Sequence, residues 1–223
     1  MGGGGFSMEP GNPALDAFVL TLARTTARPR VCFVPTASGD SERYVRDFYR
    51  AFAAHDCDPA DLALFERTQP DLRGFLLAQD VIYVGGGSTA NLLAVWRAHG
   101  VDAILREAWE QGTVLCGVSA GMNCWFEASV TDSWQVGAAG SLRDGVGLLP
   151  GSACPHYDGE PARRPAFKRL VDAGELPPGL AADDGAALVF AGTELEEVVA
   201  SRDGVAAYAV APGEERPIAA RRL

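Results

Sequence analysis

The sequence has little of what several large classes of protein require. Its 223 residues include 19 lysines and arginines against 29 aspartates and glutamates, which gives a net charge of −10 and a pI near 4.7. This excess of negative charge disfavours nucleic acid and anionic membranes as partners. No apolar run approaches the roughly eighteen residues of a membrane helix, and residues 1–6 lack the basic and apolar regions of a signal peptide. We therefore expect a cytoplasmic protein.

Cysteine is scarce and irregularly spaced. The five cysteines are odd in number and include no C-x-x-C pair, which favours reduced thiols over a disulfide framework. A zinc site made of Cys116, Cys124, Cys154 and His156 lacks any pair at metal-ligand spacing. We expect neither a metal nor an organic cofactor.

Histidine is scarcer still, with three copies. His55 and His99 end helical patterns, and His99 precedes Gly100, where a basic residue suits the helix dipole. His156 instead follows an apolar stretch that predicts a strand, and it precedes a segment rich in turn residues. His156 is therefore the candidate general base.

A G-x-S-x-G pentapeptide, Gly117 to Gly121, lies between an apolar run and a helical segment. Such a turn presents a serine Oγ at the carboxyl end of a strand, and the N–H groups that follow it can bind an oxyanion. The flanking glycines permit strained backbone angles and a close neighbouring strand. The pentapeptide predicts a nucleophile at Ser119, although an ordinary strand-to-helix turn has the same composition.

Two carboxylates downstream compete for the third position of a catalytic triad. Asp183 and Asp184 lie between apolar runs and precede Gly185, a composition that also fits a tight turn. Apolar neighbours would partly bury the pair, and buried carboxylates need partners. One of the two would hold the imidazole in the right tautomer. The chain order Ser, His, Asp differs from the Ser, Asp, His order of α/β-hydrolases.

Alternating apolar runs and amphipathic segments predict one α/β domain over residues 1–223. Residues 137–151 are expected to be glycine-rich loops, and short alternating runs over 186–222 predict terminal hairpins. The glycine run 2–5 should follow a first strand, and a flexible or truncated start is expected. Strands are predicted at 31–35, 62–65, 81–84 and 114–116, and helices at 41–54, 71–79, 89–99, 101–111 and 161–173.

The triple glycine Gly85-Gly86-Gly87 follows the strand predicted at 81–84. It lacks the lysine of a phosphate-binding P-loop and the third glycine of a dinucleotide fingerprint. Its exposed N–H groups suit an oxyanion as well as a phosphate. Beside a serine on the adjacent strand, the oxyanion interpretation is favoured.

Four segments in this order resemble the motifs of the peptidase E family of serine peptidases, which includes aspartyl dipeptidases and is related to cyanophycinases. They are Gly85-Gly86-Gly87-Ser88-Thr89, Gly117-Val118-Ser119-Ala120-Gly121, Pro155-His156-Tyr157 and Asp184-Gly185. The resemblance spans Arg30 to Phe190 and implies a fold similar to class I glutamine amidotransferases. That fold is a three-layer α/β sandwich with a mostly parallel central sheet, followed here by C-terminal β-hairpins.

The resemblance implies a nucleophile at Ser119, a base at His156 and an orienting acid at Asp184. It also implies oxyanion-hole N–H groups at Gly87 and Ala120. The candidate substrate-binding residues lie in the glycine loop and in a basic pair after the base: Gly86, Ser88, Arg163 and Arg164.

The basic pair opens a predicted helix, where the helix dipole disfavours positive charge. An arginine pair suits the side-chain carboxylate of an Asp-X dipeptide. Ordinary surface pairing with Asp158 and Glu160 is an equal alternative.

Three departures from the family's pattern affect specificity. The family's dipeptidases carry glutamate where this chain has Asp184, and Ser88 replaces the asparagine of the usual G-G-G-N-T motif. The segment after His156 is also shorter than in the dipeptidases. We therefore expect a serine peptidase that hydrolyses short peptides, with Asp-X as one substrate among several.

Two other functions stay open on the sequence alone. A non-catalytic module on the same fold, binding a small molecule, would leave Ser119 unreactive toward covalent probes. An ester or amide hydrolase with the same triad would differ from a peptidase only in a substrate panel. A homodimer is compatible with each of these functions.

Overall fold

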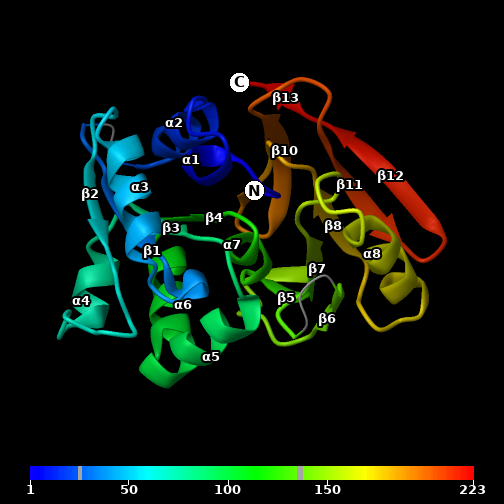
Figure 1. Cartoon of the computed structure of the whole chain (residues 1–223), viewed down its shortest axis with the longest axis horizontal. Coiled ribbons are helices and arrows are strands. Elements are labelled where there is room, and N and C mark those ends of the chain that lie inside the picture. Colours follow the sequence, from blue (N-terminus) through cyan, green and yellow to red (C-terminus); the bar gives the residue numbers. More distant parts are fainter. Residues whose placement is uncertain (25–26, 135–137) are drawn as a thin grey trace.

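A parallel four-stranded sheet forms the centre of the amino-terminal half of the molecule (Figure 1). The computed structural model describes residues 1–24, 27–134 and 138–223. The strand order is β2-β1-β3-β4. The strands are β1 (Arg30–Val34), β2 (Asp58–Asp61), β3 (Val81–Val84) and β4 (Val114–Gly117). Apolar side chains on both faces of β1 and β3 are buried, as expected for parallel strands covered on both sides.

Helices cover both faces of this sheet because successive residues of a strand point to opposite sides. Val31 and Phe33 pack in one apolar cluster, whereas Cys32 and Val34 pack in another. The first face is covered by α1 (Gly5–Met8), α2 (Ala14–Thr21) and α3 (Glu42–Phe52), and the second by α4 (Leu72–Leu77), α5 (Thr89–His99) and α6 (Val101–Glu110). The expected three-layer α/β arrangement is confirmed.

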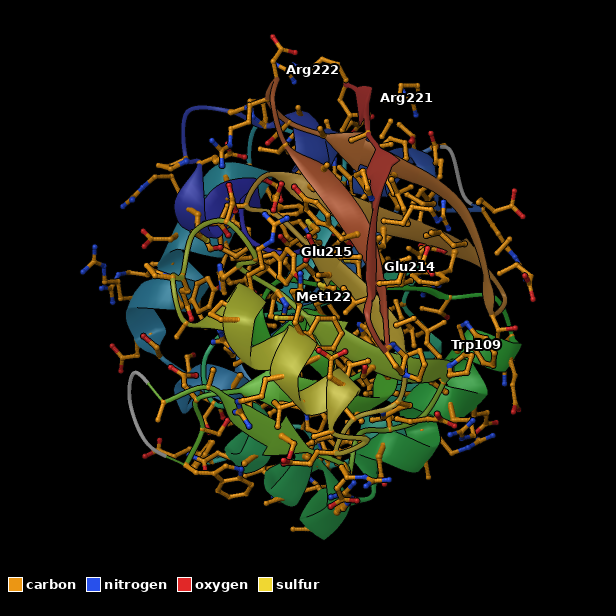
Figure 2. All side chains as sticks on the ribbon, turned by 90° about the vertical axis from the view of Figure 1, so that its right-hand side faces the viewer. Trp109, Met122, Glu214, Glu215, Arg221 and Arg222 are labelled. Carbon is orange, nitrogen blue, oxygen red and sulfur yellow. The ribbon has the colours of Figure 1, made fainter. Side chains whose placement is uncertain are left out.

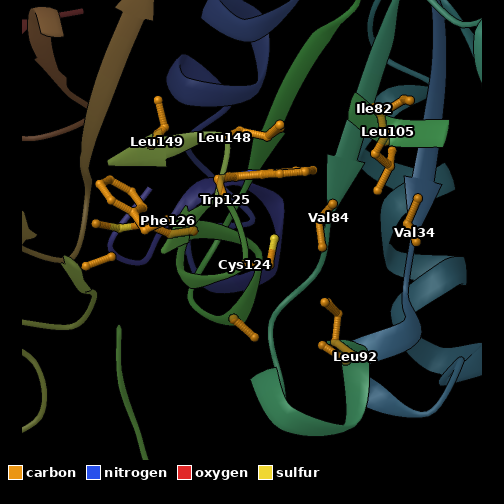
Figure 3. Packing of buried hydrophobic residues seen from close by; sticks show 14 of the residues in the cluster. Val34, Ile82, Val84, Leu92, Leu105, Cys124, Trp125, Phe126, Leu148 and Leu149 are labelled. Carbon is orange, nitrogen blue, oxygen red and sulfur yellow. The ribbon is translucent and has the colours of Figure 1, made fainter. Parts of the chain in front are cut away.

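The two faces of the sheet are packed differently. Phe33 stacks on Phe48 of α3, with ring centroids 4.9 Å apart and an interplanar angle of 15°. The opposite face is mainly aliphatic, and Figure 3 shows Leu92 of α5 and Leu105 of α6 near Val34 of β1. Dense packing of this kind holds the carboxyl ends of the strands, where the candidate site lies, in one place.

A mixed six-stranded sheet lies in the other half of the molecule, and its strand order is β12-β11-β8-β7-β5-β6. Helix α8 (Arg163–Asp172), which the sequence predicts at 161–173, packs on this sheet through Phe167 and Leu170. A smaller sheet, β13-β10-β9, lies between the two halves. The strands are β5 (Phe126–Thr131), β6 (Gly140–Leu142), β7 (Leu149–Cys154), β8 (Gly179–Ala182), β9 (Ala186–Ala191), β10 (Glu194–Ala200), β11 (Ala206–Ala211), β12 (Glu214–Ala219) and β13 (Arg221–Arg222).

The predicted terminal hairpins are present, but they belong to different sheets. Strands β9 and β10 pair antiparallel in the small sheet, and β11 and β12 pair antiparallel at the edge of the large one. The strand expected at 62–65 lies instead at 58–61, where it pairs with β1 in parallel. Leu62 and Leu64 are buried although they follow the strand, so their hydrophobicity marks core contact and not β-structure.

The range expected to be loops, 137–151, contains β6 and the first half of β7. Gly137 itself lies outside the described residues. These strands are rich in glycine, serine and alanine, which carry little apolar signal. Pairing with β5 and β8 is what makes them strands. In the described part of the chain, no helix has the length and apolarity needed to cross a membrane.

Candidate active site

Ser119 lies in a tight turn between β4 and the four-residue helix α7 (Ala120–Asn123). Its backbone φ is 59°, an angle that serine rarely adopts outside strained turns. A Cβ at Gly121 would lie 2.2 Å from the Val84 carbonyl oxygen, so this position takes glycine because the turn packs directly on β3. The predicted strand–turn–helix arrangement is therefore present, with Ser119 at the carboxyl end of β4.

The triple-glycine loop follows β3 and borders the serine. A Cβ at Gly86 would lie 3.3 Å from the Ser119 Cβ and 3.8 Å from its Oγ. The Gly86 N–H donates to the Tyr44 hydroxyl on α3 at 3.2 Å. Ser88 accepts the Asn91 N–H at 3.3 Å and so caps α5. Substrate binding by Gly86 and Ser88 stays a prediction. The Ser88 side chain also stabilises the start of α5 through its bond to the Asn91 N–H.

Two backbone N–H groups near the serine have no acceptor. Among the residues that the structure describes, neither Gly87 N–H nor Ala120 N–H donates a hydrogen bond, whereas the Gly121 N–H bonds to the Val118 carbonyl at 2.9 Å. Such unpaired donors beside a serine suit a developing oxyanion. They are the two groups that the resemblance to the peptidase E family implies for an oxyanion hole.

His156 follows β7 in a loop and has a φ of 54°. Its side chain is 11% exposed, and its Nδ1 lies 2.6 Å from Asp184 Oδ1. A carboxylate at this distance accepts the Nδ1–H, and Nε2 is then the basic nitrogen. The structure therefore brings His156 and Asp184 together and leaves Nε2 as the ring nitrogen that can accept a proton.

The two adjacent aspartates point to different parts of the molecule. Asp184 contacts the imidazole, whereas Asp183 is buried and accepts the Ala206 N–H at 3.0 Å. Burial raises the pKa of Asp183. Asp184, and not Asp183, is thus brought to His156.

Two further residues hold the Asp184 loop. Asp158 Oδ1 accepts the Asp184 N–H at 2.7 Å. Arg202 donates to the Asp184 carbonyl at 2.8 Å and reaches Asp158 at 3.4 Å. Sequence reasoning missed both as supports of the site. Arg202 had no local signal, because it lies in the turn after β10 and meets the loop only in the folded chain.

The amino-terminal segment, Met1 to Gly3, runs between the serine turn and the acid loop, in the middle of the molecule (Figure 1). Ser119 N–H donates to the Met1 carbonyl at 3.2 Å, and Gly3 forms a parallel bridge with Asp184. A Cβ at Gly3 would lie 2.1 Å from Asp184 Oδ1. Residues 2–5 are buried, so the expectation of a flexible start is wrong. Gly2 and Gly3 pass too close to the acid loop for a side chain, whereas a Cβ at Gly5 would meet Tyr83 and Asp16.

The two arginines predicted to bind substrate make intramolecular contacts. Arg163 is buried, donates to the Val130 carbonyl at 2.9 Å and pairs with Glu160 at 2.6 Å. Arg164 pairs with Glu215 and lies over the rings of two tyrosines. Figure 2 looks onto this side of the molecule, with β12 and α8 in front. Substrate binding by either arginine stays a prediction, and it would require these contacts to break.

The described residues contain no cluster of three or more histidine, cysteine, aspartate or glutamate side chains that could hold a metal ion. The five cysteines are free thiols. Burial raises the pKa of Cys116 and Cys154, which disfavours the thiolate form that metals bind. The candidate residues of the site contribute a hydroxyl, an imidazole, a carboxylate and backbone N–H groups.

Comparison with known proteins identifies the family of the chain. The family model of peptidase family S51 matches residues 1–198. The uncharacterized peptidase YgaJ of Bacillus subtilis (strain 168) is 53% identical over 210 residues, which cover 94% of this chain and 90% of YgaJ.

Two crystal structures have a similar fold. One is a peptidase from an acI-B1 Actinobacterium, with a TM-score of 0.73 and 21% identity, covering 99% of this chain and 92% of the other. The second is a putative peptidase E from Listeria monocytogenes EGD-e, with a TM-score of 0.56 and 18% identity, covering 93% and 92%. The family match extends over most of the chain and YgaJ is a close relative, so this protein is a peptidase that belongs to family S51.

Proposed function

We propose that the protein is a serine peptidase in which Ser119 is the nucleophile, His156 the general base and Asp184 the residue that orients the imidazole. The observation that carries the proposal is the 2.6 Å contact between His156 Nδ1 and Asp184 Oδ1. It is supported by the strained turn at Ser119 and by family membership. Each of these features has a separate physical cause, and together they support the assignment of a triad.

The reaction then follows the chemistry of acyl transfer. Ser119 Oγ attacks the peptide carbonyl carbon while His156 Nε2 takes the hydroxyl proton. The carbonyl oxygen becomes an oxyanion, which the N–H groups of Gly87 and Ala120 stabilise. The imidazolium returns the proton to the leaving amine, which departs and leaves an acyl-serine ester. Water hydrolyses the ester by the same proton transfers, and the carboxylic acid product leaves.

The proposed substrates are short peptides without strict selectivity for an N-terminal aspartate. An aspartate side chain needs a cationic partner, and the candidate pair Arg163 and Arg164 already binds Glu160 and Glu215. The pairing of Arg164 also keeps the pKa of Glu215 below its usual range, so that carboxylate stays charged and competes for the guanidinium. Asp-X dipeptides are therefore expected as one class of substrate among several.

Covalent labelling tests the mechanism. A fluorophosphonate should modify one serine, and mass spectrometry of the digested protein should locate the adduct on Ser119. The variant Ser119→Ala should lose about 10⁶-fold in kcat with little change in Tm, because a hydroxyl at a turn contributes little packing. Labelling of another serine, or more than about one per cent residual activity, would overturn the assignment. Turnover without any labelling would indicate a different nucleophile.

A substrate panel tests the specificity. Rates on Asp-X, Ala-X and N-blocked peptides should differ by less than about a hundredfold, which corresponds to some 3 kcal/mol in transition-state binding. A larger preference for Asp-X would show that a cationic site for aspartate exists after all. Hydrolysis of esters but of none of the peptides would contradict the peptide substrate and leave the triad intact.

A further inference from the structure

The glycine loop between β3 and α5 is fixed at both ends by backbone hydrogen bonds. Gly85 N–H donates to the Val34 carbonyl, at the end of β1, at 3.1 Å. Ser88 N–H donates to the Ala37 carbonyl, in the short helical turn after β1, at 2.8 Å. These two contacts leave the two residues in the middle of the loop to be held by other means.

The two middle residues differ in their hydrogen bonds. Gly86 N–H donates to the Tyr44 hydroxyl at 3.2 Å, whereas Gly87 N–H has no acceptor among the residues that the structure describes. The Gly87 N–H belongs to a peptide unit flanked by two glycines, which have more conformational freedom than other residues. The bond from Tyr44 fixes the preceding peptide unit and so limits how far the free donor can turn.

The ring of Tyr44 is itself held by aromatic packing. Its centroid lies 5.0 Å from that of Phe33 with an interplanar angle of 71°, and 5.4 Å from that of Phe6. A Cβ at Gly85 would lie 2.9 Å from Tyr44 Cε1, so the loop lies directly on the ring. Burial raises the pKa of Tyr44, and the hydroxyl is therefore neutral at physiological pH. A neutral hydroxyl on a fixed ring is a preorganised acceptor for the Gly86 N–H.

The residue that Tyr44 holds lies beside the proposed nucleophile. A Cβ at Gly86 would lie 3.8 Å from the Ser119 Oγ, and the free N–H of Gly87 follows Gly86 in the chain. A donor of an oxyanion hole has to lie about 2.7–3.1 Å from the developing oxyanion. A small rotation of the peptide unit would therefore weaken this interaction.

We propose that Tyr44 is a positioning residue of the oxyanion hole: its hydroxyl holds the Gly86 N–H and thereby keeps the Gly87 N–H directed toward the oxyanion that forms when Ser119 attacks. The inference rests on the proposed acyl-transfer mechanism and adds to it a residue of α3, which lies outside the four motifs of the family resemblance. In this role the hydroxyl touches no reacting atom. Its loss should therefore raise the energy of the transition state, where the oxyanion exists, and leave substrate binding nearly unchanged.

Tyr44→Phe removes the hydroxyl and keeps the ring, and Tyr49→Phe is the matched control. Tyr49 lies on the same helix, and its hydroxyl donates to Asp61 Oδ1 at 2.8 Å. The readout is the second-order rate at which a fluorophosphonate labels Ser119, because the phosphonyl oxygen uses the same oxyanion hole and no peptide specificity enters. We expect Tyr44→Phe to label about 10- to 100-fold more slowly, which is less than the loss of about 10²–10³-fold when an oxyanion donor is removed outright. Tyr49→Phe should label at the rate of the original chain.

Two further measurements separate positioning from substrate binding. With a peptide that the original chain cleaves, Tyr44→Phe should lower kcat and leave KM nearly unchanged. A loss that lies entirely in KM would show that the hydroxyl binds substrate and would overturn the proposal. The Gly86 amide should also exchange faster with deuterium in Tyr44→Phe. Unchanged exchange at Gly86 would contradict the contact on which the proposal depends.

Phe48→Leu controls for a general loss of packing. Phe48 is buried and stacks on Phe33, so this substitution loosens the same aromatic cluster and keeps the Tyr44 hydroxyl. It should lower Tm more than Tyr44→Phe does and slow labelling less. The reverse order of labelling rates would show that packing, and not the hydroxyl, positions the loop, and would overturn the proposal.

The labelling experiment also distinguishes failure of this proposal from failure of the proposed function. Labelling of Ser119 at equal rates in Tyr44→Phe and in the original chain would overturn the role of Tyr44 and leave the nucleophile in place. Absence of labelling in the original chain would overturn the proposed mechanism, and the role of Tyr44 with it.

Discussion

The two halves of the molecule position their candidate catalytic residues by different means. Ser119 is positioned by local geometry, since a strand, a tight turn and a short helix follow one another within ten residues. His156 and Asp184 are positioned by contacts between segments 28 residues apart, and Asp158 and Arg202 support these contacts. A local arrangement is recognisable from a short motif, whereas an arrangement made by distant segments is not.

The amino-terminal segment connects these two arrangements. Met1 binds the Ser119 N–H, and Gly3 bridges Asp184. Without such a connection the serine turn and the acid loop would be linked only through the packing of separate sheets. The residues of the proposed triad therefore lie in two regions that the amino-terminal segment holds together, although this segment contains no proposed catalytic side chain.

The two adjacent aspartates should differ strongly in their effect on catalysis. Asp184→Asn removes the carboxylate that contacts His156 and should lower kcat by about 10⁴-fold. Asp183→Asn is the matched control, because Asp183 bonds to the Ala206 N–H and an amide oxygen can still accept that bond. We expect Asp183→Asn to stay active and to lose about 1 kcal/mol of stability. Steady-state kinetics and urea denaturation measure both, and the reverse ranking would move the acid to Asp183.

A smaller effect should come from the connecting segment. Gly3→Ala would place a methyl group against Asp184 Oδ1, so the carboxylate must shift away from His156. We expect kcat to fall by about 10²-fold with KM nearly unchanged, as for a misplacement of about 1 Å at a reacting group. Gly11→Ala is the control, because an added Cβ there meets nothing within 4 Å.

A double-mutant cycle separates positioning from general damage. If Gly3 acts through Asp184, the cost of Gly3→Ala should shrink to less than about threefold in the Asp184→Asn background. Additive losses would contradict the positioning role and indicate a structural defect elsewhere. Tm values of all four proteins show whether folding is affected.

A further expected effect concerns the dependence of stability on pH in the parallel half. Burial raises the pKa of Asp16 to about 7, against 3.8 for an exposed carboxyl. The folded protein then keeps a proton that the unfolded chain loses between about pH 4 and 7, so this group makes stability fall as pH rises through that range. A shift of about three pKa units corresponds to at most about 4 kcal/mol.

Asp16→Asn removes this titration, and the variant should gain stability relative to the original chain as pH increases from 5 to 8. The Met1 amino group titrates with the opposite sign between about pH 6 and 8, because burial lowers its pKa to about 6. The difference between the two proteins, measured by urea denaturation at each pH, therefore isolates Asp16. A difference that does not change with pH would show that Asp16 is ionised in the folded state.

Much of the parallel half could be predicted because its signals are local. The apolar residues of β3 form the continuous run of a buried strand. In α5, the buried residues Leu92 and Trp96 recur at the spacing of a helix. Asp71 caps α4 through the Gly74 N–H at 2.8 Å, a contact within four residues of sequence. Such apolar patterns can be recognised in the sequence because each element buries residues at a regular spacing.

The second half was harder to predict, since its strands are held by their neighbours. Gly140 to Leu142 forms a strand only because β5 pairs with it, and the small residues of β7 pack between β5 and β8. The error at 62–65 has a related cause: a loop buried under a helix is as apolar as a strand. Apolar content reports burial, and hydrogen-bonded pairing has to be found in three dimensions.

The α/β class, the turn at Ser119 and the candidate base His156 could be predicted from the sequence, because each depends on residues that are neighbours in the chain. Tertiary structure alone decided which aspartate reaches the imidazole, since adjacent residues in an extended segment point to opposite sides. It also decided that the glycines of the amino-terminal segment are buried against the acid loop. Glycine has no side chain whose polarity could indicate its surroundings, so only the folded structure shows which residues a run of glycines contacts.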